Sequence, residues 1–178
     1  DKDGVINRLI ERKDSIDGHV TSPWTLEEFK NSLYPNVKES IRRLKDMDFY
    51  VFVVTNQPGV LDGNMMMTEL DSICAFLEVE YDVDHVLYAM KKDSNLYKPN
   101  NGMIESLLSG YLVDRQGSYM VGDRWKDIVP GFRSKLTTIF VGAIYTCPEE
   151  VIEIQPDYMC IDILDACCTI MELEDAGL

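Results

Sequence analysis

Residues 50–59 read Tyr-Val-Phe-Val-Val-Thr-Asn-Gln-Pro-Gly, and this stretch indicates the fold more directly than any other part of the chain. The unbroken run of aromatic and β-branched residues over 50–54 predicts a strand that is buried on both faces. Thr55, Asn56 and Gln57 then predict a polar turn at the carboxyl end of that strand. Parallel α/β sheets bind ligands beyond the carboxyl ends of their strands, and a hydroxyl, an amide and free backbone N–H groups can hold phosphate oxygens. These side chains are therefore candidates for a binding site, although an ordinary turn has the same composition.

Segments with helical spacing alternate with short apolar runs on both sides of this strand. Val37, Ile41 and Leu44 recur at helical spacing, and Asn36 with Glu39 has the spacing of a capping box. The expected helices are 37–47, 68–80, 102–108, 125–132 (shortened or bent at Pro130) and 163–173, and the expected strands are 50–54, 84–89, 118–121, 137–141 and 158–161. The segment 4–36 is expected to be polar and irregular. This alternation predicts an α/β fold, a Rossmann-like three-layer sandwich with a mostly parallel sheet.

The bulk composition limits the classes of partner. The 178 residues favour one domain, and the formal charge of −14 argues against nucleic acid or an anionic membrane as the main partner. Five cysteines form no CxxC pair and suit buried thiols in a reducing, cytoplasmic setting. The longest apolar runs are too short to span a bilayer. Nothing in the sequence defines an oligomeric state.

Two acidic clusters lie at expected strand ends. Asp1-Lys2-Asp3-Gly4 pairs two carboxylates, one of which can attack a phosphorus while the other exchanges a proton with the leaving group. Asp123 follows the strand 118–121, and Asp127 lies one helical turn later, so the second can brace the first. Magnesium prefers such hard oxygen ligands. Taken separately, the clusters also fit a solvated acidic terminus and a helix N-terminus with favourable acids.

Lys98 is the third polar signal, since an ammonium group is suited to a phosphoryl oxygen and to the carboxylate that attacks it. An isolated lysine is usually only a surface residue. The order of the signals is more specific: an acid pair, a strand ending in Thr, a Lys, and a strand ending in Gly-Asp-x-x-x-Asp. In this order the chain resembles the haloacid dehalogenase (HAD) superfamily from end to end.

The resemblance implies a role for each matched residue. Asp1 would be the nucleophile that becomes a phosphoaspartate, and Asp3 the general acid and base, as in the phosphatases of the superfamily. The carboxylates of Asp1 and Asp123 and the backbone carbonyl of Asp3 would bind Mg²⁺. The residues implied to hold or support the phosphoryl group are Thr55, Asn56, Gln57, Lys98 and Arg124, with Asp127 in support.

A narrower resemblance comes from Asp-Lys-Asp-Gly-Val-Ile-Asn at 1–7 and Val-Val-Thr-Asn-Gln-Pro-Gly-Val at 53–60, which are similar to the histidinol-phosphatase and D,D-heptose 1,7-bisphosphate phosphatase group. That group commonly has a Cys/His zinc loop before the motif lysine, whereas residues 88–97 contain neither Cys nor His. We therefore expect no structural zinc. The superfamily also begins with an apolar strand directly before its acid pair, and we expect such a strand before Asp1 as its rigid support.

The spacing of the motifs favours one capless domain over 1–178. The 52 positions from Asp3 to Thr55 leave room for a small flap, at about residues 9–25, and a helix, but for no sizeable cap. Arg8, Arg12 and Lys13 are candidate contacts for a distal anionic group, although solvated surface charge explains them better.

The leading hypothesis is a phosphomonoesterase for a small phosphorylated metabolite, with a sugar phosphate or bisphosphate such as heptose 1,7-bisphosphate favoured. A polynucleotide 3′-phosphatase is an alternative, because such enzymes share the Thr-Asn-Gln-x-Gly loop, but the net charge argues against it. A catalytically silent binding module with the same fold is a second alternative. The presence of Asp1, Asp3 and Asp123 together argues against that one.

Overall fold

The computed structural model of the protein describes residues 1–12 and 19–177. Its strands are β1 (Ile10–Glu11), β2 (Val20–Thr21), β3 (Phe52–Asn56), β4 (His85–Ala89), β5 (Tyr119–Gly122), β6 (Thr137–Val141) and β7 (Tyr158–Cys160). Its helices are α1 (Leu26–Ser32), α2 (Val37–Asp46), α3 (Met67–Glu80), α4 (Gly102–Tyr111), α5 (Trp125–Arg133) and α6 (Ile163–Ala176), with short 3₁₀ turns at Pro58–Val60 and Glu149–Val151.

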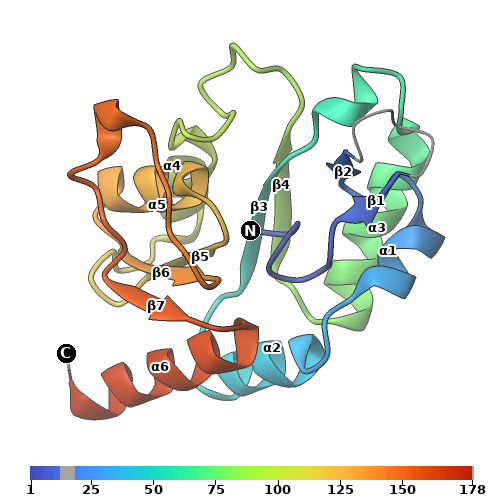
Figure 1. The fold of residues 1–178 in the computed structure, drawn as a ribbon. Coiled ribbons are helices and arrows are strands. Elements are labelled where there is room, and N and C mark those ends of the chain that lie inside the picture. The colour runs from blue at the N-terminus through green and yellow to red at the C-terminus, as the bar shows by residue number, and fades with distance from the viewer. Residues whose placement is uncertain (13–18, 178) are drawn as a thin grey trace.

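The strands of the central layer form two groups, and within each group neighbouring strands run parallel. β3 pairs with β4, and β6 pairs with β5 on one side and β7 on the other. β1 and β2 form a separate antiparallel hairpin, which is the base of the predicted flap. Helices lie on both sides of the strands (Figure 1), and this arrangement confirms the predicted α/β sandwich with a mostly parallel sheet.

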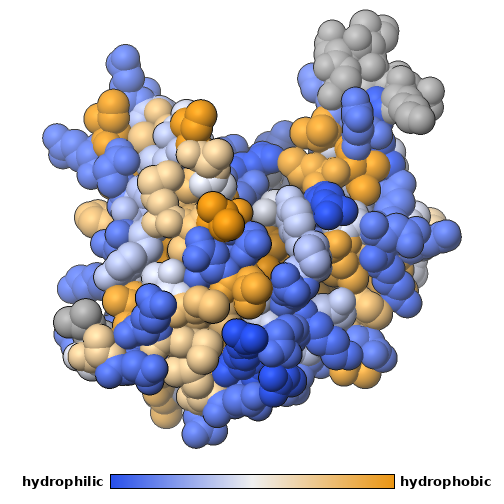
Figure 2. Space-filling view, turned by 60° about the horizontal axis from the view of Figure 1, so that its bottom comes forward, coloured by the Kyte–Doolittle hydropathy of each residue, from blue (hydrophilic) through white to orange (hydrophobic). Residues whose placement is uncertain are grey.

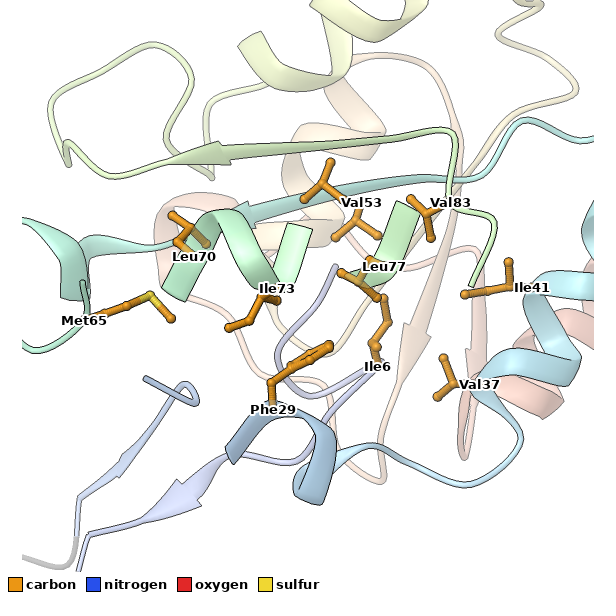
Figure 3. Packing of buried hydrophobic residues seen from close by; sticks show 11 residues of the cluster. Ile6, Phe29, Val37, Ile41, Val53, Met65, Leu70, Ile73, Leu77 and Val83 are labelled. Atoms are coloured by element: carbon orange, nitrogen blue, oxygen red, sulfur yellow. The ribbon is translucent and has the colours of Figure 1, made fainter. Parts of the chain in front are cut away.

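Neighbouring residues of β3 explain the two helical layers. Val53 and Val54 point to opposite faces because side chains alternate along a strand. Val53 packs with α1, α2 and α3 through a cluster that includes Phe29, Leu70 and Ile73 (Figure 3). Val54 instead packs with α4 in a second cluster, and a third cluster joins β6 and β7 to α6. Both faces of the strand are therefore buried, as its apolar sequence predicts.

Several local predictions differ from the structure. Asn36 adopts the left-handed conformation (φ 66°) and makes no capping hydrogen bond, so the predicted capping box there is wrong. The segment 4–36 is not irregular throughout, because it contains the β1–β2 hairpin and α1. The helix predicted at 125–132 is present as Trp125–Arg133, so Pro130 does not shorten it, and the strand predicted at 50–54 is displaced by two residues to 52–56.

An apolar slot separates the two groups of parallel strands. Among the described residues β3 pairs only with β4 and β5 only with β6, so the facing edges of β3 and β5 share no ladder. Between them lies a cavity of about 500 Å³, lined mostly by apolar side chains of β3, β5, α2, α4 and α6. Figure 2, in which the lower side of Figure 1 comes forward, shows hydrophobic side chains at the surface among hydrophilic ones. Asp1 also lines this slot, and its backbone nitrogen donates a hydrogen bond to the carbonyl of Val121 in β5 at 2.8 Å.

Candidate active site

A tight turn directs the first acid pair. The carbonyl of Lys2 accepts hydrogen bonds from the backbone N–H groups of Ile6 (2.8 Å) and Asn7 (3.2 Å), so the chain reverses immediately after Asp3. Gly4 lies in this turn with φ +92°, a conformation that favours glycine. A Cβ at Gly4 would lie 2.1 Å from Oδ2 of Asp123. Glycine is thus required for the first turn to approach the acid after β5.

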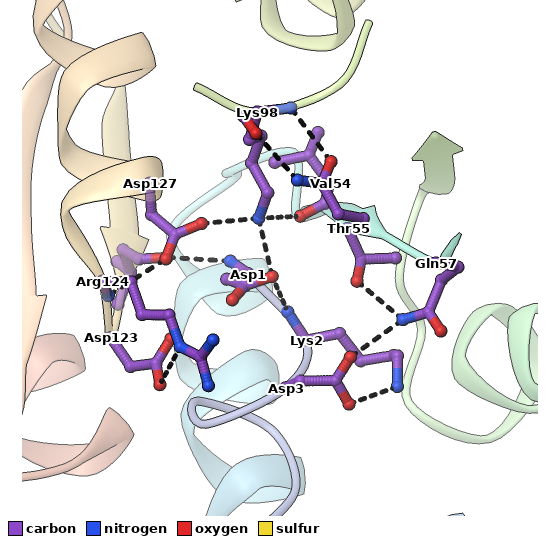
Figure 4. A network of polar contacts seen from close by, with 12 residues as sticks. Asp1, Lys2, Asp3, Val54, Thr55, Gln57, Lys98, Asp123, Arg124 and Asp127 are labelled. Carbon is purple, nitrogen blue, oxygen red and sulfur yellow. Dashed lines mark hydrogen bonds and ion pairs between the residues drawn. The ribbon is translucent and has the colours of Figure 1, made fainter. Parts of the chain in front are cut away.

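Lys98 joins two carboxylates in the centre of the site (Figure 4). Its Nζ donates to Oδ1 of Asp1 at 2.7 Å, to Oδ1 of Asp127 at 2.6 Å and to the carbonyl of Val54 at 2.9 Å. Lys98 is 3% exposed, so these contacts lie in a largely dry environment where charge interactions are strong. The other oxygen of Asp1, Oδ2, accepts no hydrogen bond from the described residues and is left for a reacting group.

Three carboxylates converge at one point. Ligand atoms of Asp1, Asp123 and Asp127 all lie within 4.8 Å of one another. Oδ1 of Asp123 is buried and has no hydrogen-bond partner among the described residues. Desolvation, followed by the charge of Asp127, raises the pKa of Asp123 to about 6. A divalent cation would remove both penalties, so the residues present fit Mg²⁺.

Asp123 and Asp127 differ in what they leave free. Both oxygens of Asp127 are engaged: Oδ1 accepts from Lys98, and Oδ2 accepts from the backbone N–H of Arg124 at 3.1 Å. Gly122 permits this packing, because a Cβ there would lie 2.1 Å from Cβ of Asp127. The geometry therefore suits Asp123 as a cation ligand and Asp127 as its brace.

The carboxylate of Asp3 is held by side chains from separate segments. It accepts hydrogen bonds from Lys2, Asn7, Ser22 and Gln57. Burial would raise the pKa of Asp3, but the charge of Lys2 and the hydrogen bonds from Lys2, Asn7 and Ser22 outweigh it and hold the pKa below its usual value.

The polar side chains at the carboxyl end of β3 and directly after it form hydrogen bonds within the protein. Asn56 donates to the carbonyl of Lys98 and accepts from the backbone N–H of Lys98, both at 2.9 Å. Gln57 is 2% exposed and donates to Oγ1 of Thr55 at 2.9 Å as well as to Asp3. Neither amide points freely into the site as a phosphate ligand would, and the Thr55 hydroxyl accepts from the same Gln57 nitrogen as Asp3. The contacts of Asn56 and Gln57 suit positioning roles in place of the predicted phosphate contacts.

The basic residues around the site behave differently from one another. The Arg124 side chain is 56% exposed and lies 3.7 Å from Asp123, at the rim. Arg8 packs over the ring of Tyr34, with 5.3 Å between its guanidinium carbon and the ring centroid. Arg12 is bound to Glu28 through two hydrogen bonds and stacks on Trp24, so it stabilises the flap base and is not free for a distal anion. Lys13 lies outside the described residues, as does the part of the flap at 13–18.

Lys2, Asn7 and Ser22 are site residues that the sequence did not single out. Lys2 is 0% exposed. In the sequence, a lysine between two acids looks like a solvated surface charge, and only the turn after Asp3 shows that it is buried. Asn7 lies in the motif at 1–7 and could have been chosen from it. No local pattern identifies Ser22, because its contact with Asp3 spans 19 positions.

Comparisons with known proteins show which proteins this chain is similar to. A family model described as HAD-hydrolase-like matches residues 96–166. A D-glycero-beta-D-manno-heptose-1,7-bisphosphate 7-phosphatase from Rhodopseudomonas palustris is 29% identical over 155 residues, which are 75% of this chain and 79% of that protein. The D-glycero-D-manno-heptose-1,7-bisphosphate 7-phosphatase of Chlorobaculum tepidum is 26% identical over 190 residues, 93% and 89% of the two chains.

The fold has solved counterparts as well. The D,D-heptose 1,7-bisphosphate phosphatase from B. bronchiseptica, crystallised with magnesium and phosphate, superposes with a TM-score of 0.73 at 21% identity and covers 96% of both chains. No helix in the described part of the chain combines the length and the hydropathy needed to cross a membrane. The sequence matches and the shared fold together support a phosphatase of the haloacid dehalogenase superfamily, similar to the group that includes the D,D-heptose 1,7-bisphosphate phosphatases.

Proposed function

We propose that the protein is a Mg²⁺-dependent phosphomonoesterase that acts through a phosphoaspartate at Asp1 on a small phosphorylated sugar. The observation that carries the proposal is the convergence of Asp1, Asp123 and Asp127 within 4.8 Å, with Lys98 bonded to two of them. When bound, Mg²⁺ would be held by Asp1, Asp123 and the carbonyl of Asp3, and it would neutralise charge on the phosphoryl oxygens.

The residues divide the reaction into two displacements. In the first, a carboxylate oxygen of Asp1 bonds to phosphorus and the bond from phosphorus to the sugar oxygen breaks. Asp3, which is ionised in the free protein and takes up a proton from solvent when the anionic phosphate binds beside it, gives that proton to the sugar oxygen. In the second, Asp3 takes a proton from water, the water oxygen bonds to phosphorus, and the bond from phosphorus to Asp1 breaks. Lys98, whose three N–H groups are bonded to Asp1, Asp127 and the Val54 carbonyl, would contribute its positive charge next to the phosphoryl group, and the Thr55 hydroxyl would donate to a phosphoryl oxygen in both steps. Inorganic phosphate leaves, and both acids return to their starting states.

The substrate class rests on the relatives and on charge. The matched proteins are named as phosphatases of heptose 1,7-bisphosphates, so a sugar bisphosphate is the first candidate. A net charge of −14 disfavours a polynucleotide, which needs a basic track along its backbone.

A phosphate-release panel tests the proposal. The purified protein is assayed with heptose 1,7-bisphosphate, fructose 1,6-bisphosphate, p-nitrophenyl phosphate and a 3′-phosphorylated oligonucleotide, each with MgCl₂ and with EDTA. We expect Mg²⁺-dependent release that is fastest from a sugar phosphate. Preference for the oligonucleotide would favour the 3′-phosphatase alternative, and no release from any substrate would favour the binding module.

Magnesium affinity should depend on pH through Asp123. Because its pKa is about 6 in the metal-free protein, protons compete with Mg²⁺ for this carboxylate below that value. We expect the apparent affinity for Mg²⁺ to be flat above about pH 7 and to fall by up to roughly tenfold per unit well below pH 6. Calorimetric titration with MgCl₂ at several pH values measures this. An affinity that stays constant down to pH 5 would contradict the assignment of Asp123.

The raised pKa of Asp123 affects the stability of the metal-free protein in the opposite direction, because this stability should fall as pH rises. The folded pKa of Asp123 lies above its ordinary value of 3.8, so the folded state binds more protons than the unfolded state between these values. The contribution of this group therefore lowers stability as pH rises from about 4 to 6, and bound Mg²⁺ should reduce that loss. Tm measured by thermal unfolding between pH 4 and 6, without and with MgCl₂, gives the loss of stability and the part of it that Mg²⁺ prevents.

We also propose that an extended apolar segment directly before Asp1 occupies the slot between β3 and β5. The facing strand edges, the apolar lining and the hydrogen bond from Asp1 to Val121 all support a parallel strand there. It would hold the nucleophile between the two groups of strands.

Designed extensions test the slot. We compare the chain preceded by Val-Ile-Phe-Leu-Val with one preceded by Ser-Asn-Ser-Gly-Ser. Burial of apolar side chains should raise Tm by roughly 5 °C or more in the first only, and slow hydrogen exchange in β3 and β5. Equal behaviour of the two extensions would rule the strand out.

A further inference from the structure

Four side-chain donors surround the carboxylate of Asp3. Oδ1 accepts from Lys2 Nζ at 2.6 Å and from Asn7 Nδ2 at 3.0 Å, while Oδ2 accepts from Gln57 Nε2 at 2.8 Å and from Ser22 Oγ at 2.9 Å. A carboxylate offers about four acceptor sites, so these donors fix its position and its rotation. Figure 4 shows Lys2 and Gln57 approaching Asp3 from different elements.

The donors differ in burial. Lys2 and Asn7 are 0% exposed and Gln57 is 2% exposed, whereas Ser22 is only partly buried at the end of the flap strand β2. The three buried donors cannot easily turn away from the carboxylate. The hydrogen bond from Ser22 is therefore the one that Asp3 can give up when it contacts a leaving-group oxygen.

Lys2 is the strongest of the four. Its Nζ also lies 5.2 Å from the centroid of the Phe29 ring, and Phe29 is fully buried in the core. The ammonium group is therefore held between a rigid aromatic face and a single carboxylate, and Asp3 is its one ion-pair partner among the described residues. A short, charge-assisted hydrogen bond of this kind restricts the angle at which Asp3 can approach a substrate.

Gln57 links this arrangement to the phosphoryl side of the site. One amide nitrogen donates both to Asp3 and, at 2.9 Å, to Oγ1 of Thr55. The Asp3 carboxylate and the hydroxyl of Thr55, a residue of β3, are therefore bonded to the same amide nitrogen.

We propose that Lys2, Asn7 and Gln57 are positioning residues that hold Asp3 at the angle required for proton transfer, with Lys2 contributing most. The inference rests on the proposed function, in which Asp3 protonates the sugar oxygen and later deprotonates water. A displacement of about 1 Å at such a group costs roughly a hundredfold in rate.

The test compares leaving groups in Lys2→Met. A sugar alkoxide requires a proton as it leaves, but p-nitrophenolate does not. With the best sugar phosphate of the panel, we expect kcat to fall roughly a hundredfold with little change in KM. With p-nitrophenyl phosphate, phosphorylation of Asp1 should remain fast while the water step is slow. Rapid mixing should then show a burst of about one p-nitrophenolate per site before slow turnover.

Further variants separate positioning from folding. Lys2→Arg, which keeps the cation, should recover part of the sugar phosphate rate. Lys38→Met makes the same change of charge at an exposed position on α2, outside the site, and should change kcat less than about threefold. If Lys2→Met does not fold, Gln57→Leu, which removes a neutral donor, should show the same selective loss at smaller size. A proportional loss on both substrates without a burst, or no loss, would overturn the proposal while native activity still supported the proposed function.

Discussion

Asp1→Asn should abolish Mg²⁺-dependent phosphate release, with a loss of roughly 10⁴-fold or more. The amide keeps the size of the carboxylate and can still contact Lys98, but it is a poor nucleophile and a weaker cation ligand. Since the change is isosteric at a side chain that is 10% exposed, the fold should survive. Phosphate release from the best substrate of the panel, with and without MgCl₂, measures the effect.

Asp71→Asn provides a matched control. Asp71 is exposed on α3, away from the converging carboxylates, and its substitution makes the same change of charge. It should leave kcat within about twofold, as surface substitutions usually do. Substantial Mg²⁺-dependent turnover by Asp1→Asn would exclude the covalent mechanism at this residue.

Lys98→Met should destabilise the protein and inactivate it. The substitution leaves the carboxylates of Asp1 and Asp127 without the ammonium group that lies 2.7 and 2.6 Å from them. Removing one partner of a buried ion pair costs about 3–5 kcal/mol, which for a chain of this size lowers Tm by roughly 10 °C. Bound Mg²⁺ would neutralise part of the negative charge that the loss of Lys98 leaves unpaired, so MgCl₂ should raise Tm more in this variant than in the native protein. Activity should not return.

Lys126→Met makes the same change of charge at an exposed position next to Asp127. It should shift Tm by no more than about 2 °C. Thermal unfolding of the three proteins with and without MgCl₂ measures the difference. An unchanged Tm for Lys98→Met would show that the two carboxylates do not depend on Lys98.

The sequence predicted the strands and the acids better than the local details. Buried strands such as Phe52–Asn56 are visible because a strand covered on both faces must be apolar throughout. Asp123 is predictable because it follows the end of β5, and parallel strands end at the same edge, while Asp127 lies one helical turn further on. The directions of the Asn56 and Gln57 side chains are not predictable in this way, because distant partners, Lys98 and Asp3, determine them.

The N-termini of α1 and α2 show why the spacing of a capping box does not by itself predict a cap. Thr25 and Glu28 have capping-box spacing, and the Thr25 hydroxyl does accept a hydrogen bond from the Glu28 N–H, so α1 was detectable. Asn36 and Glu39 have the same spacing, but Asn36 follows Pro35 and turns to positive φ, which directs its side chain away from the helix start. Backbone conformation, which the spacing does not specify, separates the two cases.

The division of the sheet affects how the enzyme behaves between turnovers. Thr55 belongs to the strands on one side of the slot, and Asp123 and Asp127 follow a strand on the other, while Asp1 lies between them. A ligand that contacts both groups binds only when they are correctly spaced, so its binding energy also opposes their separation. At a hundred times its Kd, such a ligand adds about 2.7 kcal/mol to folding stability. The lifetime of the protein in a cell would then follow its substrate supply, with the idle enzyme the first to be lost to proteolysis.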